Sequence, residues 1–149
     1  MRIEGAKGHR FPPREFLPEE VLCVAQYARV IGSTDPAYFS TAAARDAGFA
    51  ARPLPHAIFS FFQAVPEREL YDTLDLTFGK TLFAGAETET GVVATETDTV
   101  VGRTWVEDVY EKPGRDGGTR QFLILMTEFT VKETSDMIMR SRLTFIEKH

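Results

Sequence analysis

The spacing of hydrophobic residues changes along the chain, from a helical period in the first half to a strand-like period in the second. Residues 1–14 are polar, with two glycines and two prolines, and predict an arm or a short edge strand. Pro18 suits the first position of a helix, and the apolar residues after it share one helical stripe. We therefore expect a first helix over residues 18–31. Its stripe comprises Val21, Val24, Ala25, Ala28 and Ile31.

Residues 32–62 predict a turn, a short helix, a loop and then a central helix. Gly32 and Pro36 carry turn chemistry, because glycine permits unusual backbone angles and proline cannot continue an unbroken helix. Residues 40–47 are rich in alanine and predict a short helix with a hydroxyl residue as its cap. After a loop with several prolines, a strongly apolar helix is expected to begin at Leu54 and to be buried on most sides.

From residue 77 onward the pattern predicts strands, because β-branched and aromatic residues alternate with polar ones. The sequence PGRDGG over residues 113–118 is turn chemistry and favours a hairpin. Consecutive strands joined by turns imply an antiparallel sheet, and a buried helix before such a sheet requires the sheet to wrap around it. The expected fold class is α+β, with residues 1–149 as one domain. The expected strands cover 82–93, 99–111, 119–132 and 136–147.

Composition and charge narrow the function classes. With 149 residues the chain is long enough for one core, and its formal net charge of -5 disfavours nucleic acid or an anionic membrane as a partner. Cys23 is the only cysteine, so no intramolecular disulfide can form. No apolar run reaches the length of a membrane span, and the N-terminus lacks an apolar signal core. We therefore expect a cytoplasmic protein.

His56, at the start of the apolar central helix, is the first candidate for chemistry. A helix N-terminus offers free backbone N–H groups and the positive end of the helix dipole, which can hold a polarised carbonyl. A purely structural histidine is the alternative reading. The histidines and the cysteine lie far apart in the sequence, and no glycine-rich loop precedes a helix after a strand. The sequence therefore predicts no metal site and no cofactor.

Three short motifs carry a resemblance to a known family. Residues 32–38 read GSTDPAY, residues 47–49 read AGF, and residues 55–58 read PHAI at the start of the central helix. In this order they resemble the MaoC-like (R)-specific enoyl-CoA hydratase and 3-hydroxyacyl-thioester dehydratase family, which has the hot-dog fold. Residues 103–117 resemble the N-terminal-type hot-dog domains of this family. The resemblance covers most of residues 16–148 and implies an antiparallel sheet wrapped around a central helix.

The positions that the family uses for catalysis carry other side chains here. The family motif reads about G-D-x-N-P-x-H, so its catalytic Asp and His positions fall on Ser33 and Tyr38. An unassisted hydroxyl does not ionise near neutral pH, and a tyrosine, with a reference pKa of about 10, is a poor base at pH 7. The resemblance also implies that the backbone N–H of Ala57 polarises a thioester carbonyl. For substrate binding we expect Ala57, Ile58, Phe61, Phe62 and Val65.

Three functions stay open, and with them whether the chain is itself an enzyme. In the first, it is the non-catalytic half of a 2-enoyl-CoA hydratase or 3-hydroxyacyl-thioester dehydratase, shapes the acyl tunnel and pairs with a catalytic hot-dog chain. Asp35, Tyr38 and Phe39 resemble a segment of such inactive subunits. In the second, a homodimeric hydratase uses His56 with Asp35, although Asp35 before a proline is also a common turn residue. In the third, the chain is a non-enzymatic module that binds an acyl thioester or another protein.

The expected partners follow from these alternatives. The resemblance implies an acyl-CoA or acyl-carrier-protein thioester as the small ligand. A single sheet wrapped on one helix leaves a sheet edge unpaired, and two such units commonly join edges. We therefore expect a homodimer, or a heterodimer with another hot-dog subunit, and neither a nucleic acid nor a membrane as a partner.

Overall fold

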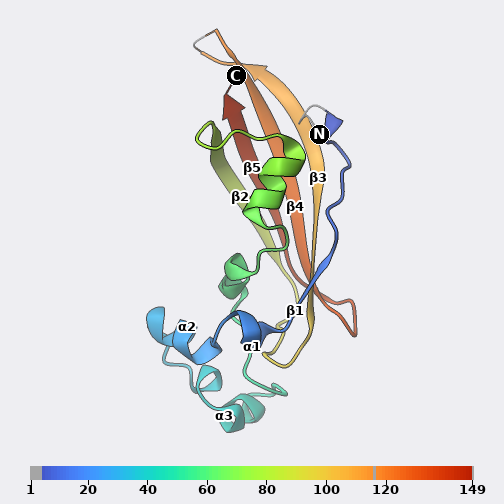
Figure 1. Cartoon of the computed structure of the whole chain (residues 1–149). Coiled ribbons are helices and arrows are strands. Elements are labelled where there is room, and N and C mark those ends of the chain that lie inside the picture. The colour runs from blue at the N-terminus through green and yellow to red at the C-terminus, as the bar shows by residue number, and fades with distance from the viewer. Residues whose placement is uncertain (1–4, 116, 149) are drawn as a thin grey trace.

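A twisted sheet of five antiparallel strands forms the body of the molecule (Figure 1). The computed structural model describes residues 5–115 and 117–148. The strands lie side by side in the order β1-β3-β4-β5-β2. The expected α+β fold with one antiparallel sheet is confirmed. The strands are β1 (Arg14–Phe16), β2 (Thr81–Thr90), β3 (Val100–Pro113), β4 (Thr119–Val131) and β5 (Met137–Lys148).

The last three strands form a meander, as the turn chemistry predicts. The hairpin between β3 and β4 closes where Gly114 N donates to Gly118 O, at 2.7 Å. The first long strand does not pair with its sequence neighbour, because β2 lies at the opposite edge of the sheet against β5. The short strand β1 occupies the other edge against β3. Two edges are therefore left, one short and one ten residues long.

The N-terminal arm lies along β3. Gly8 N donates to Val106 O and Phe11 N donates to Thr104 O, at 2.9 and 3.0 Å. Ala6 and Phe11 are buried, so this segment adds apolar side chains to the core. Of the two expectations for residues 1–14, an arm or a short edge strand, the structure has the arm over residues 5–13, since β1 begins only at Arg14. Residues 1–4 lie outside the described part.

The expected first helix over residues 18–31 is wrong as one element, because the structure has two helices there. They are α1 (Pro18–Val21) and α2 (Val24–Val30), and the two residues between them, Leu22 and Cys23, are extended. The break turns Leu22 onto the hydrophobic core, which a continuous helix would not do. Val21 and Ile31, expected on the buried stripe, are instead exposed.

Two short elements follow α2 and gather with it at one end of the sheet (Figure 1). They are η2 (Pro36–Tyr38), a 3-10 helix, and α3 (Thr41–Asp46), which matches the expected short helix. Ser40 caps α3, because its hydroxyl oxygen accepts from Ala43 N at 3.3 Å. Gly32 has a positive φ of 73°, as the predicted turn requires.

The expected continuous central helix is also wrong in its details. The segment begins with η3 (His56–Phe61), a 3-10 helix, and Phe62 after it is extended. Only from Glu67 does an α-helix form, α4 (Glu67–Leu74), with Pro66 as its N-cap. Burial on most sides is not observed, since Phe61 is 59% exposed. The break places the side chain of Phe62 in the core, while α4 crosses the face of the sheet (Figure 1).

Two hydrophobic clusters hold these layers together. The first cluster packs η3, α2 and η2 against the sheet. In it Phe59, Phe62 and Phe129 are in mutual ring contact. The second packs Leu74 of α4 against Leu123 and other residues at the opposite end of the sheet. The two clusters are separated along the strands, and the space between them is described next.

Candidate functional site

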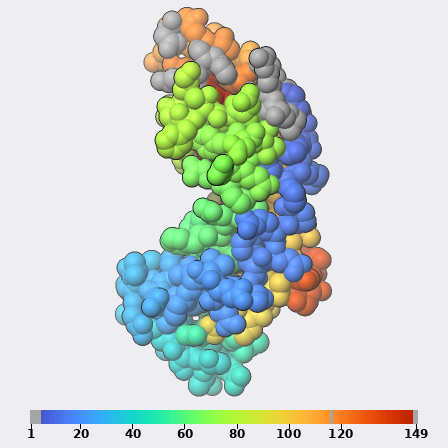
Figure 2. Space-filling view, viewed as in Figure 1, coloured from blue at the N-terminus to red at the C-terminus, as the bar shows by residue number. Residues whose placement is uncertain are grey.

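A cavity of about 700 Å³ lies between the η3–α4 segment and the sheet. From the side of η3 and α4 it is lined by Phe59, Phe62, Val65 and Leu70. In Figure 2 the green atoms of the α4 segment lie in front of the sheet, and Leu70 of α4 is the residue of this helix that lines the cavity. Its volume falls in the range of small-molecule sites, which is about 300–1,000 Å³.

The sheet supplies the floor of the cavity. Because side chains alternate between the two faces of a strand, every second residue of β4 and β5 reaches it. These are Leu125, Thr127 and Phe129 on β4, and Met139, Ser141, Leu143 and Phe145 on β5. The floor is thus mainly apolar at both ends and polar in the middle.

Four hydroxyl side chains form a row across the middle of this floor, which we call the hydroxyl row. Thr104 of β3 is paired with Thr127 of β4, Thr127 with Ser141 of β5, and Ser141 with Thr88 of β2. The Oγ1 atoms of Thr104 and Thr127 lie 3.0 Å apart. Thr88 Oγ1 lies 3.5 Å from Ser141 Oγ. All four residues line the cavity.

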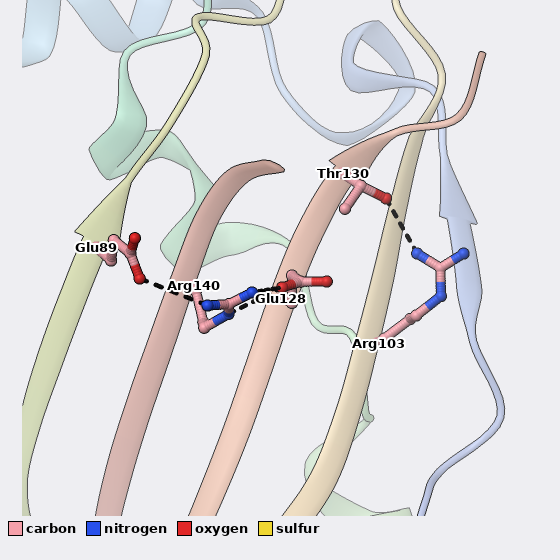
Figure 3. A network of polar contacts seen from close by, with 5 residues as sticks. All are labelled: Glu89, Arg103, Glu128, Thr130 and Arg140. Carbon is pink, nitrogen blue, oxygen red and sulfur yellow. Dashed lines mark hydrogen bonds and ion pairs between the residues drawn. The ribbon is translucent and has the colours of Figure 1, made fainter. Parts of the chain in front are cut away.

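An ion-pair network fixes the register of the same strands on the opposite face of the sheet (Figure 3). Arg140 of β5 donates from Nε to Glu128 of β4 at 2.8 Å and lies 3.6 Å from Glu89 of β2. The hydrogen bond to Glu128 raises the pKa of the Arg140 guanidinium. Arg103 of β3 donates to the hydroxyl of Thr130 at 3.0 Å. These charged residues keep adjacent strands aligned, and with them the hydroxyl row.

His56 lies at the N-terminus of η3, on the cavity wall. Its Nε2 atom is buried and has no hydrogen-bond partner among the described residues. A buried nitrogen without a hydrogen-bond partner costs free energy. Among the described residues that line the cavity, His56 is also the only histidine.

The loop before η3 is anchored to the β2–β3 connection, which fixes the position of His56. Leu54 N donates to Ala94 O at 2.8 Å, and Glu96 N donates to Arg52 O at 2.9 Å. The side chains of Arg52 and Glu96 add an ion pair of 2.9 Å. The hydrogen bond to Glu96 raises the pKa of the Arg52 guanidinium. Backbone and side-chain contacts thus hold the start of η3 from one side.

The residues at the family's catalytic positions do not line the cavity. Ser33 and Asp35 lie in the loop between α2 and η2, where Asp35 is exposed. One carboxylate oxygen of Asp35 accepts from Ala37 N at 2.9 Å, as a turn residue does. Tyr38 is half-buried and packs against the hydrophobic cluster that contains Phe59. No described contact brings Asp35 and His56 together.

The expected substrate-binding residues fall into three environments. Ala57, Phe62 and Val65 line the cavity. Ile58 is 1% exposed and belongs to the core beside the cavity. Phe61 points away from the cavity and packs against Tyr27, with ring centroids 6.0 Å apart.

Sequence reasoning missed the hydroxyl row. Single threonines and serines are common in strands, and nothing in the sequence tells which of them face each other. The alternation of Leu125, Thr127 and Phe129 is visible in the sequence, but the pairing with Thr104 and Ser141 depends on strand register.

Two other site types find no support in the described part of the chain. No group of three or more His, Cys, Asp or Glu side chains is placed to hold a metal ion there. None of the helices over residues 5–115 and 117–148 is long and apolar enough to cross a membrane.

Comparisons with known proteins agree on one type of domain. The family model described as "FAS1-like, dehydratase domain region" matches residues 6–138. No curated protein sequence gives a significant match. Among solved structures, a chain of the HadBC (3R-hydroxyacyl-ACP dehydratase) complex from Mycobacterium tuberculosis superposes with a TM-score of 0.71 at 19% identity, covering 95% of this chain and 96% of that one.

Two further structures give the same fold. A chain of the ChsH1-ChsH2 complex from Mycobacterium tuberculosis has a TM-score of 0.67 at 17% identity, covering 97% of this chain and 86% of that chain. The (R)-hydratase from A. caviae has a TM-score of 0.65 at 16% identity, covering 93% and 94%. The expected hot-dog fold is confirmed by these likenesses.

Proposed function

This chain belongs to the family of FAS1-like dehydratase domain regions, and from that premise we propose that it is the non-catalytic subunit of a hot-dog hydratase or dehydratase. In this proposal the chain binds the acyl part of a 2-enoyl or (R)-3-hydroxyacyl thioester in its cavity. A second hot-dog chain supplies the groups that move protons. Family membership supports the class of reaction, and the division of labour between two chains is the new element.

The observation that carries the proposal is the character of the cavity lining. Hydration of a 2-enoyl thioester requires a base that activates water and an acid that protonates Cα. Among the described lining residues, His56 is the only candidate for such a role, and no carboxylate accompanies it. A cavity of about 700 Å³ with mainly apolar walls is suited to an acyl chain. The cavity is therefore suited to bind an acyl chain, while its described lining residues lack an acid–base pair.

The free sheet edge supports a second hot-dog chain as the partner. Strand β2 pairs with β5 on one side only, and eight of its ten residues are exposed. A long unpaired edge is a template for pairing with another strand. The HadBC and ChsH1-ChsH2 structures are described as complexes of two named chains. We infer that β2 joins a strand of a partner chain, with the cavity near the joint.

One observation favours a second candidate, a homodimeric hydratase that uses His56. Its buried Nε2 atom lies on the cavity wall without a partner among the described residues, as the base of an unliganded site would. The carboxylate of Asp35, expected beside it, is engaged by Ala37 N in an exposed turn instead. The homodimer therefore has a proton acceptor but lacks its second group.

Titration of the isolated chain with a saturated acyl-CoA tests whether the cavity binds an acyl chain. Binding to the folded state alone raises the melting temperature, by about 8 °C at a ligand concentration a hundred times Kd. CoA without an acyl chain is the control and is expected to have a much smaller effect. Equal shifts with both ligands would contradict the acyl cavity. Binding without hydration by this chain in any complex would support the non-enzymatic module instead.

A further inference from the structure

We propose that the hydroxyl row selects acyl chains that carry an oxygen atom, as a hydroxyl or oxo group, beyond the reacting carbons. The inference rests on the proposed function, because it assumes that the cavity holds an acyl thioester. It names the substrate class more narrowly, since an unsubstituted hydrocarbon chain would be a poorer ligand than an oxygenated one.

The hydroxyl row lies between two apolar parts of the cavity floor. On one side of it along the strands, Phe129 and Met139 belong to the hydrophobic cluster around η3. On the other side, Leu125 and Leu143 belong to the cluster beneath α4. A chain that runs from one end of the cavity to the other therefore crosses apolar, hydroxyl-bearing and again apolar surface.

The hydroxyl row keeps hydrogen-bond donors that its own pairs do not use. When two hydroxyls share one hydrogen bond, one of them donates and the other keeps its proton for another acceptor. In the described part of the chain, Thr104 bonds with Thr127, and Thr88 with Ser141, and no further partner is recorded for these hydroxyls. One donor therefore remains free in each pair, and both face the cavity. An oxo or hydroxyl oxygen at this level can accept from them.

An unsubstituted hydrocarbon chain is expected to bind less well, because it would remove water from the hydroxyl row. A hydrocarbon chain laid across the row removes water from these hydroxyls and offers no hydrogen bond in exchange, which is unfavourable. Thr104 and Ser141 are already buried, with 5% and 8% exposure, so little water can reach them once a chain is bound. Sites with buried hydrogen-bonding groups discriminate strongly against ligands that lack the matching group.

Ion pairs on the opposite face of the sheet hold the hydroxyl row in register. Glu128, Arg140 and Glu89 are the sequence neighbours of Thr127, Ser141 and Thr88, and their ion pairs lie across the same three strands. A slip of one residue between β4 and β5, or between β5 and β2, would break these ion pairs and move the hydroxyls of the displaced strand to the other face. The hydroxyl positions are thus specified, as a recognition element requires.

The test is calorimetric titration of the full chain with saturated acyl-CoAs of one length. One ligand is unsubstituted, and the others carry a single oxo group at successive carbons from carbon 5 outward. We expect at least one oxo isomer to bind about fivefold more tightly than the unsubstituted chain, which is the effect of one neutral hydrogen bond. The ratio of the two affinities is the readout, because it cancels any general weakening of the protein.

Three variants make the test specific. Thr127→Val and Ser141→Ala are expected to bring the ratio to about one, while Thr144→Val, a change on β5 that does not line the cavity, is expected to preserve it. Equal or weaker binding of every oxo isomer by the natural chain would overturn the inference and leave the proposed function intact. An unchanged ratio in Thr127→Val and Ser141→Ala would also overturn it. Failure of every acyl-CoA to bind would contradict the proposed function itself.

Discussion

His56 is the residue on which the competing accounts differ most. It lies on the cavity wall with a buried Nε2 atom that lacks a partner among the described residues. If a partner chain supplies the acid and the base, the imidazole contributes to the shape and polarity of the cavity and to nothing else. If His56 is the base, its loss removes the proton transfer.

Replacement of His56 with alanine separates these roles. We expect His56→Ala to lower kcat/KM of the two-chain complex less than about tenfold, because the proposed function places the catalytic groups on the other chain. Loss of a general base costs about 10²–10⁴-fold. The measurement is enoyl-CoA hydration by the reconstituted complex with either chain. A drop of a hundredfold or more would assign catalysis to His56.

Asp35 illustrates a side chain whose role is local. Its carboxylate accepts from Ala37 N at the start of η2, so the interaction stabilises a turn rather than a reaction. We predict that Asp35→Ala lowers the free energy of unfolding by about 1 kcal/mol. Asp35→Asn keeps the acceptor oxygen and should have little effect. Urea denaturation of both variants measures this, and equal losses would argue against the turn role.

Strand β2 is the element whose position matters most for pairing with a partner. Its end is held against β5 where Gly91 N donates to Ile138 O at 2.8 Å. A Cβ atom at Gly91 would overlap the carbonyl oxygen of Met137, which is backbone and cannot move aside cheaply. By contrast, a Cβ at Gly85, within β2, would meet nothing within 4 Å.

This contrast gives a matched pair of variants for the β2–β5 contact. We predict that Gly91→Ala lowers the free energy of unfolding by about 1–3 kcal/mol, the usual cost of overpacking. Gly85→Ala is expected to change it by less than about 1 kcal/mol. Urea denaturation of the two variants is the measurement. A Gly91→Ala protein as stable as Gly85→Ala would show that the end of β2 is not held as described.

The sequence predicted the strands better than the helices, and the reason is physical. Alternation and turn residues are local signals, so β3, β4 and β5 begin and end close to the expected residues. The helical expectations failed where tertiary packing decides. Leu22 and Phe62 are extended because each then reaches the core, and the period of apolar residues alone could not indicate that.

In the candidate site too, features that depend on local sequence could be predicted, and features that depend on strand pairing and packing could not. The resemblance located the chain segment that carries His56, Ala57 and Phe62, and the structure places all three on the cavity wall. It did not locate the hydroxyl row, because Thr104 and Ser141 become neighbours of Thr127 only through strand register. Nor did it indicate that Phe61 turns outward. These features depend on pairing and packing over long sequence separations.

At the scale of the whole molecule, we propose that this chain binds the acyl group while a second chain carries the groups that move protons. The hot-dog fold, the cavity and the free edge of β2 are present. Ser33 and Tyr38, which the resemblance aligns with the family's Asp and His, are not among the residues that line the cavity. Under the proposed function, such a chain is active only together with a catalytic partner. The expected partner is a hot-dog chain of similar size, encoded beside this one, that carries the Asp and the His.

The most direct test is the hydration of crotonyl-CoA by this chain alone, by the neighbouring hot-dog chain alone and by the two chains purified together. The account predicts no turnover by the isolated chain and turnover at about 1–10³ s⁻¹, the range of ordinary enzymes, by the pair. Substitution of the partner's Asp and His should abolish the activity of the pair. Turnover in that range by this chain alone would contradict the account.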